Sequence, residues 1–317
     1  MHISLNRLRS SCLLFAFLFL SNLELHAQSS ADFTQVLPLA IEDREGRLVT
    51  SIRPEQVEIE GQVATVQSLE LDSAPRRILL ILDTSGSMGD RKSLSWSNVV
   101  RFASQFALQR RGDDLIGLDT LAERDQVLVP LTSDSQSVIR QIGAITTSGA
   151  GRTMLGLALS EILERRENGL SFGDAIILVS DGNRSVAGKT DFVRLRDRLT
   201  RAGIRICLIR VPSVMDLATW PEETDASEFV KKTGGIELSM LSSLQEVRPG
   251  GTRINAEMTA RTVQAAYAFA RSYYRVGLKI STPIRKQTPL RLGVVDQQGK
   301  PIKGLQLNYP RFLSPPT

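Results

Sequence analysis

The sequence predicts an α/β protein with a mostly parallel, doubly wound, Rossmann-like sheet, one antiparallel edge strand and small flanking β segments. Two observations carry this prediction. From residue 77 onward, short apolar runs alternate with segments of helical period, which is the pattern of a sheet covered by helices on both faces. Two neighbouring runs, near Leu115 and Val127, are separated by only a few residues. That spacing is too short for a parallel crossover and predicts an antiparallel hairpin.

Residues 1–27 have the order and size of a secretory signal peptide. Arg7 and Arg9 precede a nine-residue apolar run that begins at Cys12, a polar segment follows, and cleavage is expected after Ala27. A membrane anchor is the alternative, but nine residues fall well short of the ~20 that a helix needs to cross a bilayer. Lipid attachment is not expected, because Cys12 precedes the apolar run instead of following it. The sequence therefore predicts a protein that is secreted or periplasmic.

The composition excludes several classes of function. The 317-residue chain has a mild formal net charge of +5 and no basic cluster with interleaved aromatic residues, so nucleic-acid binding is not expected. Both histidines, His2 and His26, lie in the predicted signal peptide. The mature protein would therefore lack the imidazole that Ser-His-Asp sites, Cys-His sites and His-ligated zinc require. The remaining cysteine, Cys207, lies in an apolar run and is expected to be a core thiol without a disulfide partner.

The mature chain divides into three predicted segments. Residues 28–75 are expected to form an N-terminal β region, residues 76–272 the α/β domain, and residues 273–317 a C-terminal β extension and tail. Neither β segment has enough strands to be stable alone, so we expect the two to pack together beside the large sheet. Apolar residues at three- and four-residue steps predict the buried faces of two helices in the α/β domain: Trp96, Val99, Val100, Ala103, Phe106 and Ala107, and later Leu155, Ala158, Leu159 and Ile162.

Oxygen-bearing side chains gather at the expected carboxyl edge of the sheet, where open α/β folds bind ligands. Asp83 ends an apolar strand, and Ser85 and Ser87 follow in the next turn. A later strand leads into Asp181, and Thr153 lies between the two strands, in a Gly-rich loop before a helix. Two carboxylates and three hydroxyls suit a hard divalent cation such as Mg²⁺, which prefers about six oxygen ligands. A coordination position left open on this ion would accept a carboxylate from an acidic partner.

These residues resemble the metal-ion-dependent adhesion site of von Willebrand factor type A (VWA) domains. The matching elements are D-x-S-x-S at Asp83, Ser85 and Ser87, a Thr in a Gly-rich loop at Thr153, and Asp-Gly at Asp181. The resemblance extends over the predicted α/β domain and implies a protein-binding module. It further implies that the five residues hold Mg²⁺, Mn²⁺ or Ca²⁺, and that the partner supplies an Asp or Glu to the ion. The flanking segments resemble those of exported VWA-domain proteins of acidobacteria.

Three other interpretations remain open for these residues. Asp83, Ser85 and Ser87 could be turn formers, and Thr153 could be a helix N-cap. The two strand ends also loosely resemble hydrolases of the haloacid dehalogenase type, in which Asp83 would be a nucleophile and Asp181 a Mg²⁺ ligand. Such enzymes usually carry a second Asp where this chain has Ser85, so we expect no enzymatic activity. The third alternative is a scaffold in which the metal only ties the loop together.

Two short motifs are not expected to be functional. The Arg111-Gly112-Asp113 tripeptide falls where a helix is expected to end at Gly112 before a strand begins. Asn183 starts a formal N-glycosylation pattern, which means little in a bacterial protein. Asp90 is expected to be a solvated loop residue and not part of a second ion site.

Overall fold

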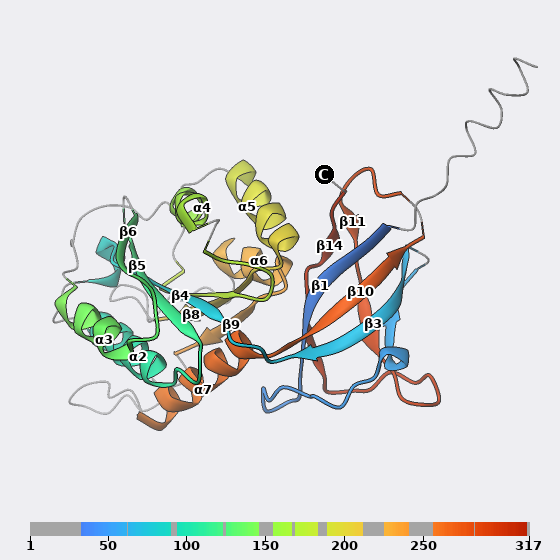
Figure 1. Ribbon diagram of the computed structural model, residues 1–317, viewed down its shortest axis with the longest axis horizontal. Coiled ribbons are helices and arrows are strands. Elements are labelled where there is room, and N and C mark those ends of the chain that lie inside the picture. The colour runs from blue at the N-terminus through green and yellow to red at the C-terminus, as the bar shows by residue number, and fades with distance from the viewer. Residues whose placement is uncertain are drawn as a thin grey trace, which may run out of the picture.

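The structure is a computed structural model of the chain. Figure 1 shows an α/β part, from β4 to α7, beside a β-rich part built from the two ends of the chain. The predicted signal peptide lies outside the described residues, as do Asp90, Thr153 and Asn183. The structure describes residues 33–61, 63–89, 94–122, 125–145, 155–166, 169–182, 189–211, 225–240, 256–281 and 283–315.

A six-stranded sheet forms the centre of the α/β part, in the order β6-β5-β4-β7-β8-β9. Every neighbouring pair is parallel except β5 and β6, which are antiparallel. The predicted fold class, with one antiparallel edge strand, is confirmed. The strands are β4 (Arg77–Asp83), β5 (Leu115–Leu121), β6 (Asp125–Thr132), β7 (Ala175–Ser180), β8 (Arg205–Arg210) and β9 (Ile236–Ser239).

Helices cover both faces of this sheet because successive strand residues point to opposite sides. In β4, Ile78, Leu80 and Leu82 join the core under one set of helices, while Leu79 and Ile81 join the core under the other. The first face packs against α2 (Leu94–Leu108), α3 (Ser135–Ala144) and α7 (Ala256–Arg271). The second face packs against α4 (Leu155–Arg166), α5 (Lys189–Ala202) and α6 (Asp225–Lys232).

The β-rich part joins segments from both ends of the chain, as expected from the sequence. Its largest sheet has the order β13-β1-β10-β3, so the C-terminal strand β10 lies between two N-terminal strands. Two smaller pairs, β12-β2 and β11-β14, complete the part. The strands are β1 (Phe33–Glu42), β2 (Val57–Ile59), β3 (Ala64–Asp72), β10 (Tyr273–Ile280), β11 (Thr288–Pro289), β12 (Leu292–Val294), β13 (Gln306–Asn308) and β14 (Phe312–Leu313).

The chain leaves the β-rich part and returns to it at one place. Asp72, the last residue of β3, lies opposite Tyr273, the first residue of β10. The Tyr273 hydroxyl donates a 3.0 Å hydrogen bond to Asp72 Oδ2, and Arg76 donates to Asp72 Oδ1. Arg76 Nε also donates to the carbonyl of Arg271 at 3.0 Å. The α/β part is thus inserted between two paired strands, and its first and last residues are tied together.

Arg205 stabilises the junction between the α/β part and the β-rich part, and it belongs to the α/β part. Its guanidinium is buried and donates to the carbonyls of Gly173 (2.8 Å) and Ala270 (2.6 Å), and it lies 4.3 Å from the centroid of the Tyr273 ring. Gly173 has φ +88°, and a Cβ on this residue would come within 2.0 Å of the Tyr273 hydroxyl. Burial lowers the pKa of Arg205 to about 9, so the side chain stays charged at neutral pH.

Smaller sequence predictions can also be compared with the structure. Cys207 is buried, without a disulfide partner among the described residues, as expected. The expectation that a helix ends at Gly112 is wrong, because α2 already ends at Leu108. Gly112 instead has φ +53° in a turn closed by the hydrogen bond from Asp114 N to the Arg111 carbonyl. Within the described ranges, each helix is too short or too polar to cross a membrane.

Candidate metal centre

Asp83 and Asp181 come together at the carboxyl edge of the six-stranded sheet. Asp83 ends β4, and Asp181 directly follows β7. The two strands are parallel neighbours, with Leu82 opposite Val179, so Asp83 emerges beside Ser180 and Asp181 follows one residue later. The Asp181 carboxylate is close enough to Asp83 to raise the pKa of Asp83. Both carboxylates are nearly inaccessible, at 0% and 3% relative exposure. The prediction that these two acids meet at one sheet edge therefore agrees with the strand pairing.

The loop after Asp83 is held by bonds to its own backbone and to the neighbouring strand. Ser85 N donates to Asp83 Oδ1 at 2.9 Å, which is the local bond that an Asp makes in a turn. Thr84 donates to the Leu121 carbonyl of β5 through both its backbone N (2.8 Å) and its hydroxyl (3.2 Å). Met88 is buried in the core under α2. These contacts fix where the hydroxyls of the loop lie.

Two of the predicted hydroxyl ligands lie together. Ser85 Oγ and Ser87 Oγ are 3.2 Å apart; Ser85 is buried and Ser87 is partly exposed. The structure thus groups Asp83, Ser85 and Ser87 in one loop, with Asp181 on the adjacent strand end. The fifth predicted ligand, Thr153, lies outside the described residues, so its place in the site stays a prediction.

Ser180 is a member of this group that the sequence reasoning missed. Its hydroxyl donates a 2.6 Å hydrogen bond to Asp83 Oδ2 and accepts one from Gly182 N at 3.1 Å. Ser180 is the last residue of β7 and therefore lies beside Asp83 in the parallel pair. The order of the strands would have identified Ser180, because Ser180 and Asp83 are 97 positions apart and meet only when β4 and β7 are neighbours.

The electrostatics of Asp83 favour a neutralising cation. Burial and, as a smaller cause, the nearby Asp181 carboxylate raise the pKa of Asp83 to about 6, against the hydrogen bonds from Ser180 and Ser85, which act in the opposite direction. Two buried acids side by side are costly because each disfavours the charged form of the other. A divalent ion beside them would remove that cost. At neutral pH, above its raised pKa, Asp83 is a buried carboxylate that a nearby cation would stabilise.

The donor set suits a hard cation held by oxygen. Among the described residues there is no group of three or more His, Cys, Asp or Glu side chains that could hold a metal. The group at the sheet edge instead combines two carboxylates with serine hydroxyls, which are ligands that Mg²⁺ and Mn²⁺ accept and that soft metals do not prefer. Such a site would bind its ion only with further oxygen ligands from other residues, water or a partner.

Residues 78–183, from β4 to just beyond Asp181, match the family model described as the von Willebrand factor type A domain. The α/β part has a VWA-like fold. We use VWA domain below for the elements from β4 to α7. No curated protein matches the chain.

Solved structures of similar fold come from diverse sources. One is a von Willebrand factor type A protein from Catenulispora acidiphila (12% identity, 88% of this chain and 73% of that chain, TM-score 0.47). A second is an aerotolerance-related membrane protein from Bacteroides fragilis (17% identity, 60% and 98%, TM-score 0.42). A third is a manganese-loaded TRAP protein from Plasmodium vivax (12% identity, 78% and 97%, TM-score 0.42). These similarities concern the fold alone.

Proposed function

We propose that this chain is an exported, metal-dependent protein-binding module. In this proposal Asp83, Ser85, Ser87, Thr153 and Asp181 hold one Mg²⁺, or Mn²⁺ or Ca²⁺, at the carboxyl edge of the VWA domain. An Asp or Glu of the partner protein completes the coordination of the ion. The observation that carries the proposal is the position of Asp83 and Asp181 at the ends of two neighbouring parallel strands, where the Asp181 carboxylate adds to the cost of charging the buried Asp83.

The residues of the chain have distinct tasks in this mechanism. Asp83 and Asp181 balance the charge of a divalent ion, while the serine hydroxyls add neutral oxygen ligands. Ser180 and Ser85 N hold the two oxygens of Asp83 in place. Because three of the five ligands are neutral, the ion keeps its attraction for an incoming carboxylate. The partner is therefore recognised by its acidic side chain and released when the metal is removed.

The rival hydrolase function is less well supported. Hydrolases of the haloacid dehalogenase type usually carry a second Asp two residues after the nucleophile, where this chain has Ser85. A serine hydroxyl cannot take the place of that second carboxylate as an acid or base near neutral pH. We therefore propose that the protein is not an enzyme. A scaffold with a purely structural metal remains the second alternative. Crosslinking with and without a chelator distinguishes this scaffold from a metal-dependent binding module.

Export and domain boundaries belong to the same proposal. Residues 1–27 would be removed after Ala27, which would place the mature protein in the periplasm or the medium. The VWA domain would extend over residues 76–272, between a β region of residues 28–75 and an extension of residues 273–317. The fact that β1, β3 and β10 share one sheet supports treating the last two segments as one folded unit.

Crosslinking in the producing cell tests the proposal. Tagged wild-type protein and Thr153→Ala are crosslinked in the periplasm or medium, with and without a chelator, and partners are identified after pull-down. We expect a partner that is recovered with wild type in Mg²⁺ and lost both with chelator and in Thr153→Ala, while circular dichroism shows that the variant is folded. Full recovery of that partner by folded Thr153→Ala in excess chelator would instead make the metal structural.

A further inference from the structure

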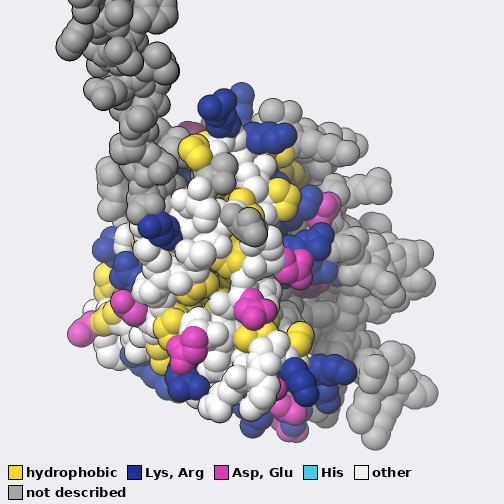
Figure 2. All heavy atoms as spheres, turned by 90° about the vertical axis from the view of Figure 1, so that its right-hand side faces the viewer, with side chains coloured by type: hydrophobic (Ala, Val, Ile, Leu, Met, Phe, Trp, Pro, Cys, Tyr) yellow, Lys and Arg dark blue, Asp and Glu magenta, His cyan; other side chains and the backbone are white. Residues whose placement is uncertain are grey.

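A groove opens in the β-rich part, on the side away from the VWA domain. It has a volume of about 830 Å³ and lies between η1 (Pro54–Gln56), β2 and the first half of β3. Its apolar surface comes from Val57, Ile59, Ala64 and Val66. Val57 and Ala64 are buried, and Ile59 and Val66 are partly exposed. Figure 2 faces this end of the molecule and shows apolar side chains exposed between acidic ones.

Both strands beside the groove have an unpaired edge within the described part of the chain. There β2 pairs only with β12, and β3 pairs only with β10. No ladder connects β2 with β3 in that part of the chain, although they follow each other in sequence. An exposed strand edge offers a row of backbone donors and acceptors to an added strand.

A bulge divides the edge of β3 into two regular stretches, of which the first lies beside the groove. Gly277 lies opposite Ser68, and the next residue, Leu278, lies opposite Val66, so Gln67 is the additional residue in β3. A bulge bends an edge strand and interrupts its pairing. The regular stretch on the groove side of the bulge runs from Ala64 to Val66, and these residues line the groove. The available edge is therefore short, and it is located where the apolar surface lies.

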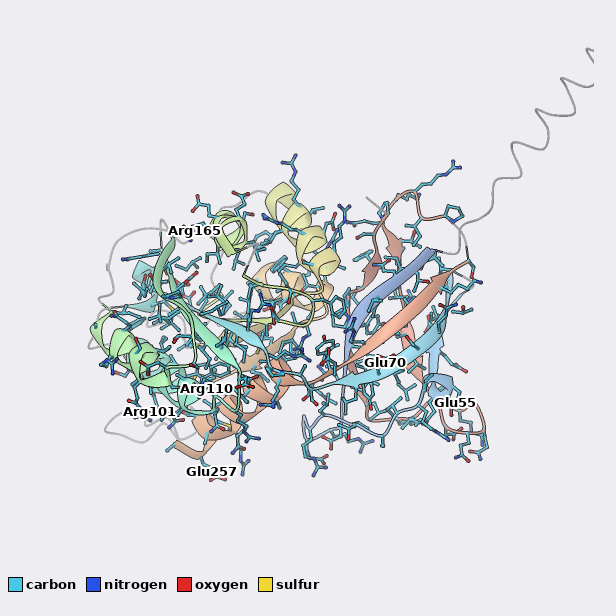
Figure 3. All side chains as sticks on the ribbon, viewed as in Figure 1. Glu55, Glu70, Arg101, Arg110, Arg165 and Glu257 are labelled. Atoms are coloured by element: carbon cyan, nitrogen blue, oxygen red, sulfur yellow. The ribbon has the colours of Figure 1, made fainter. Side chains whose placement is uncertain are left out.

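The rim of the groove is acidic. The lining residues include Glu55 and Glu58 but no Lys or Arg, although the whole chain has more basic than acidic residues. Figure 3 labels Glu55, the middle residue of η1, at this end of the molecule. Glu55 forms an ion pair with Arg53 at 3.2 Å, with both side chains more than half exposed. Such an exposed pair is weak and can exchange for a pair with an incoming cation.

We propose that this groove binds an extended, basic segment of a partner protein as an added β-strand. Every second side chain of the segment would be apolar and would pack on the partly exposed Ile59 and Val66, because side chains alternate between the two faces of a strand. Lys or Arg at the intervening positions would reach Glu55 and Glu58. This recognition uses the opposite charge from the metal edge and needs no ion, so the chain would have two independent contact sites for proteins.

Fluorescence anisotropy with a defined peptide tests this proposal. The probe is a fluorescein-labelled, N-acetylated octapeptide of alternating Lys and Val, titrated with the mature chain in Mg²⁺ and in chelator. We expect saturable binding that is the same in both conditions. The double variant Glu55→Lys/Glu58→Lys should bind at least about tenfold more weakly, because like charges then face each other. The same peptide with N-methyl groups on alternate residues should not bind, because it cannot pair with a strand edge.

A matched control separates groove binding from general attraction. Glu45 also forms an exposed 3.2 Å ion pair, with Arg47, but lies outside the groove lining. Glu45→Lys should leave the affinity unchanged, and circular dichroism with thermal unfolding shows whether each variant is folded. Equal weakening by Glu45→Lys, equal binding of the N-methylated peptide, or no binding at all would overturn the proposal. Self-association of the wild type that is lost in Glu55→Lys/Glu58→Lys would assign the groove to a second copy of the chain instead. Because peptide binding is also measured in chelator, the result tests the groove proposal independently of the proposed metal site.

Discussion

Ser180 Oγ donates a 2.6 Å hydrogen bond to Asp83 Oδ2 and so joins the ends of β7 and β4. The bond orients one oxygen of Asp83, and Ser85 N orients the other. An Asp that is held at both oxygens keeps its position before a metal arrives. We therefore expect metal affinity at this edge to depend on residues that do not themselves contact the ion.

Removal of Asp83 should abolish divalent metal binding. Isothermal titration of Mg²⁺ or Mn²⁺ into the purified mature chain should show one dominant site, and Asp83→Ala should show none. Asp113→Ala, which removes an exposed acid from the turn before β5, is the control and should bind like wild type. Equal binding by wild type and Asp83→Ala would show that the site lies elsewhere.

Loss of the Ser180 hydroxyl should weaken metal binding without removing a ligand. Ser180→Ala should lower the affinity for Mn²⁺ by about tenfold, the range seen when a ligand loses its supporting hydrogen bond. Ser180→Thr keeps the hydroxyl and should restore most of the affinity, which a purely steric effect would not do. The measurement is titration calorimetry at constant pH. Wild-type affinity in Ser180→Ala would mean that Asp83 needs no orienting bond.

Glu42 should make the protein less stable as the pH rises. Burial raises the pKa of this carboxyl from 4.5 to about 7; Asn308 opposes the shift by donating a hydrogen bond, and Asp43 adds to it. A raised folded-state pKa means that the folded protein holds the proton more tightly, so stability is lost as pH rises from 4.5 through 7. Between pH 5 and pH 8, the loss caused by Glu42 should be on the order of 2 kcal/mol.

Urea denaturation of Glu42→Gln at both pH values measures this contribution. The variant should lose the part of the pH dependence that Glu42 causes, and comparison with wild type cancels the effects of other acids such as Asp83. Exposed Glu45→Gln should follow the wild-type curve. If Glu42→Gln has the wild-type pH dependence, the Glu42 carboxyl titrates near its ordinary pKa.

Replacement of Arg205 should destabilise the junction between the VWA domain and the β-rich part. Arg205→Met would leave the carbonyls of Gly173, Phe269 and Ala270 without this donor in a buried place. We expect the free energy of unfolding to fall by about 3 kcal/mol, measured by urea denaturation. Arg201→Met removes an exposed arginine from α5 and should change the free energy of unfolding little. A neutral effect of Arg205→Met would mean that water or neighbouring groups replace the guanidinium.

No phosphate should be trapped on Asp83. A haloacid dehalogenase-like enzyme would form an aspartyl-phosphate that hydroxylamine releases. Incubation of the mature chain with Mg²⁺ and a phosphoryl donor, followed by mass spectrometry, should leave the Asp83 peptide unmodified. Modification that disappears in Asp83→Asn, or phosphatase turnover lost in that variant, would favour the hydrolase interpretation over a binding module.

The sequence was sufficient for the sheet and for the position of two acids at its carboxyl edge. Alternating apolar runs predicted the strands and helices, and the short spacing after Leu121 predicted the antiparallel edge. Asp83 and Asp181 could be placed at one edge because both follow buried strands. The bond from Ser180 could not be foreseen, since it depends on which strands are neighbours. Arg205 was also missed, because a buried charge is unusual and its partners are carbonyls at the end of α7, far along the chain.

The insertion of the VWA domain between Asp72 and Tyr273 has a consequence for the order of folding. These residues are 201 positions apart, so an unfolded chain must close a long loop before β3 can pair with β10. A folded VWA domain brings the two ends of that loop together before β3 and β10 pair, because a hydrogen bond joins Arg76 Nε to the carbonyl of Arg271. The VWA domain has its own core and does not need that loop to be closed first. The β3-β10 ladder, in contrast, forms more easily once the VWA domain has folded, because the two strands are then already close together. Substitutions that destabilise the VWA core should make β3 and β10 sensitive to proteolysis. Substitutions that destabilise β3 or β10 should leave the VWA core resistant to proteolysis.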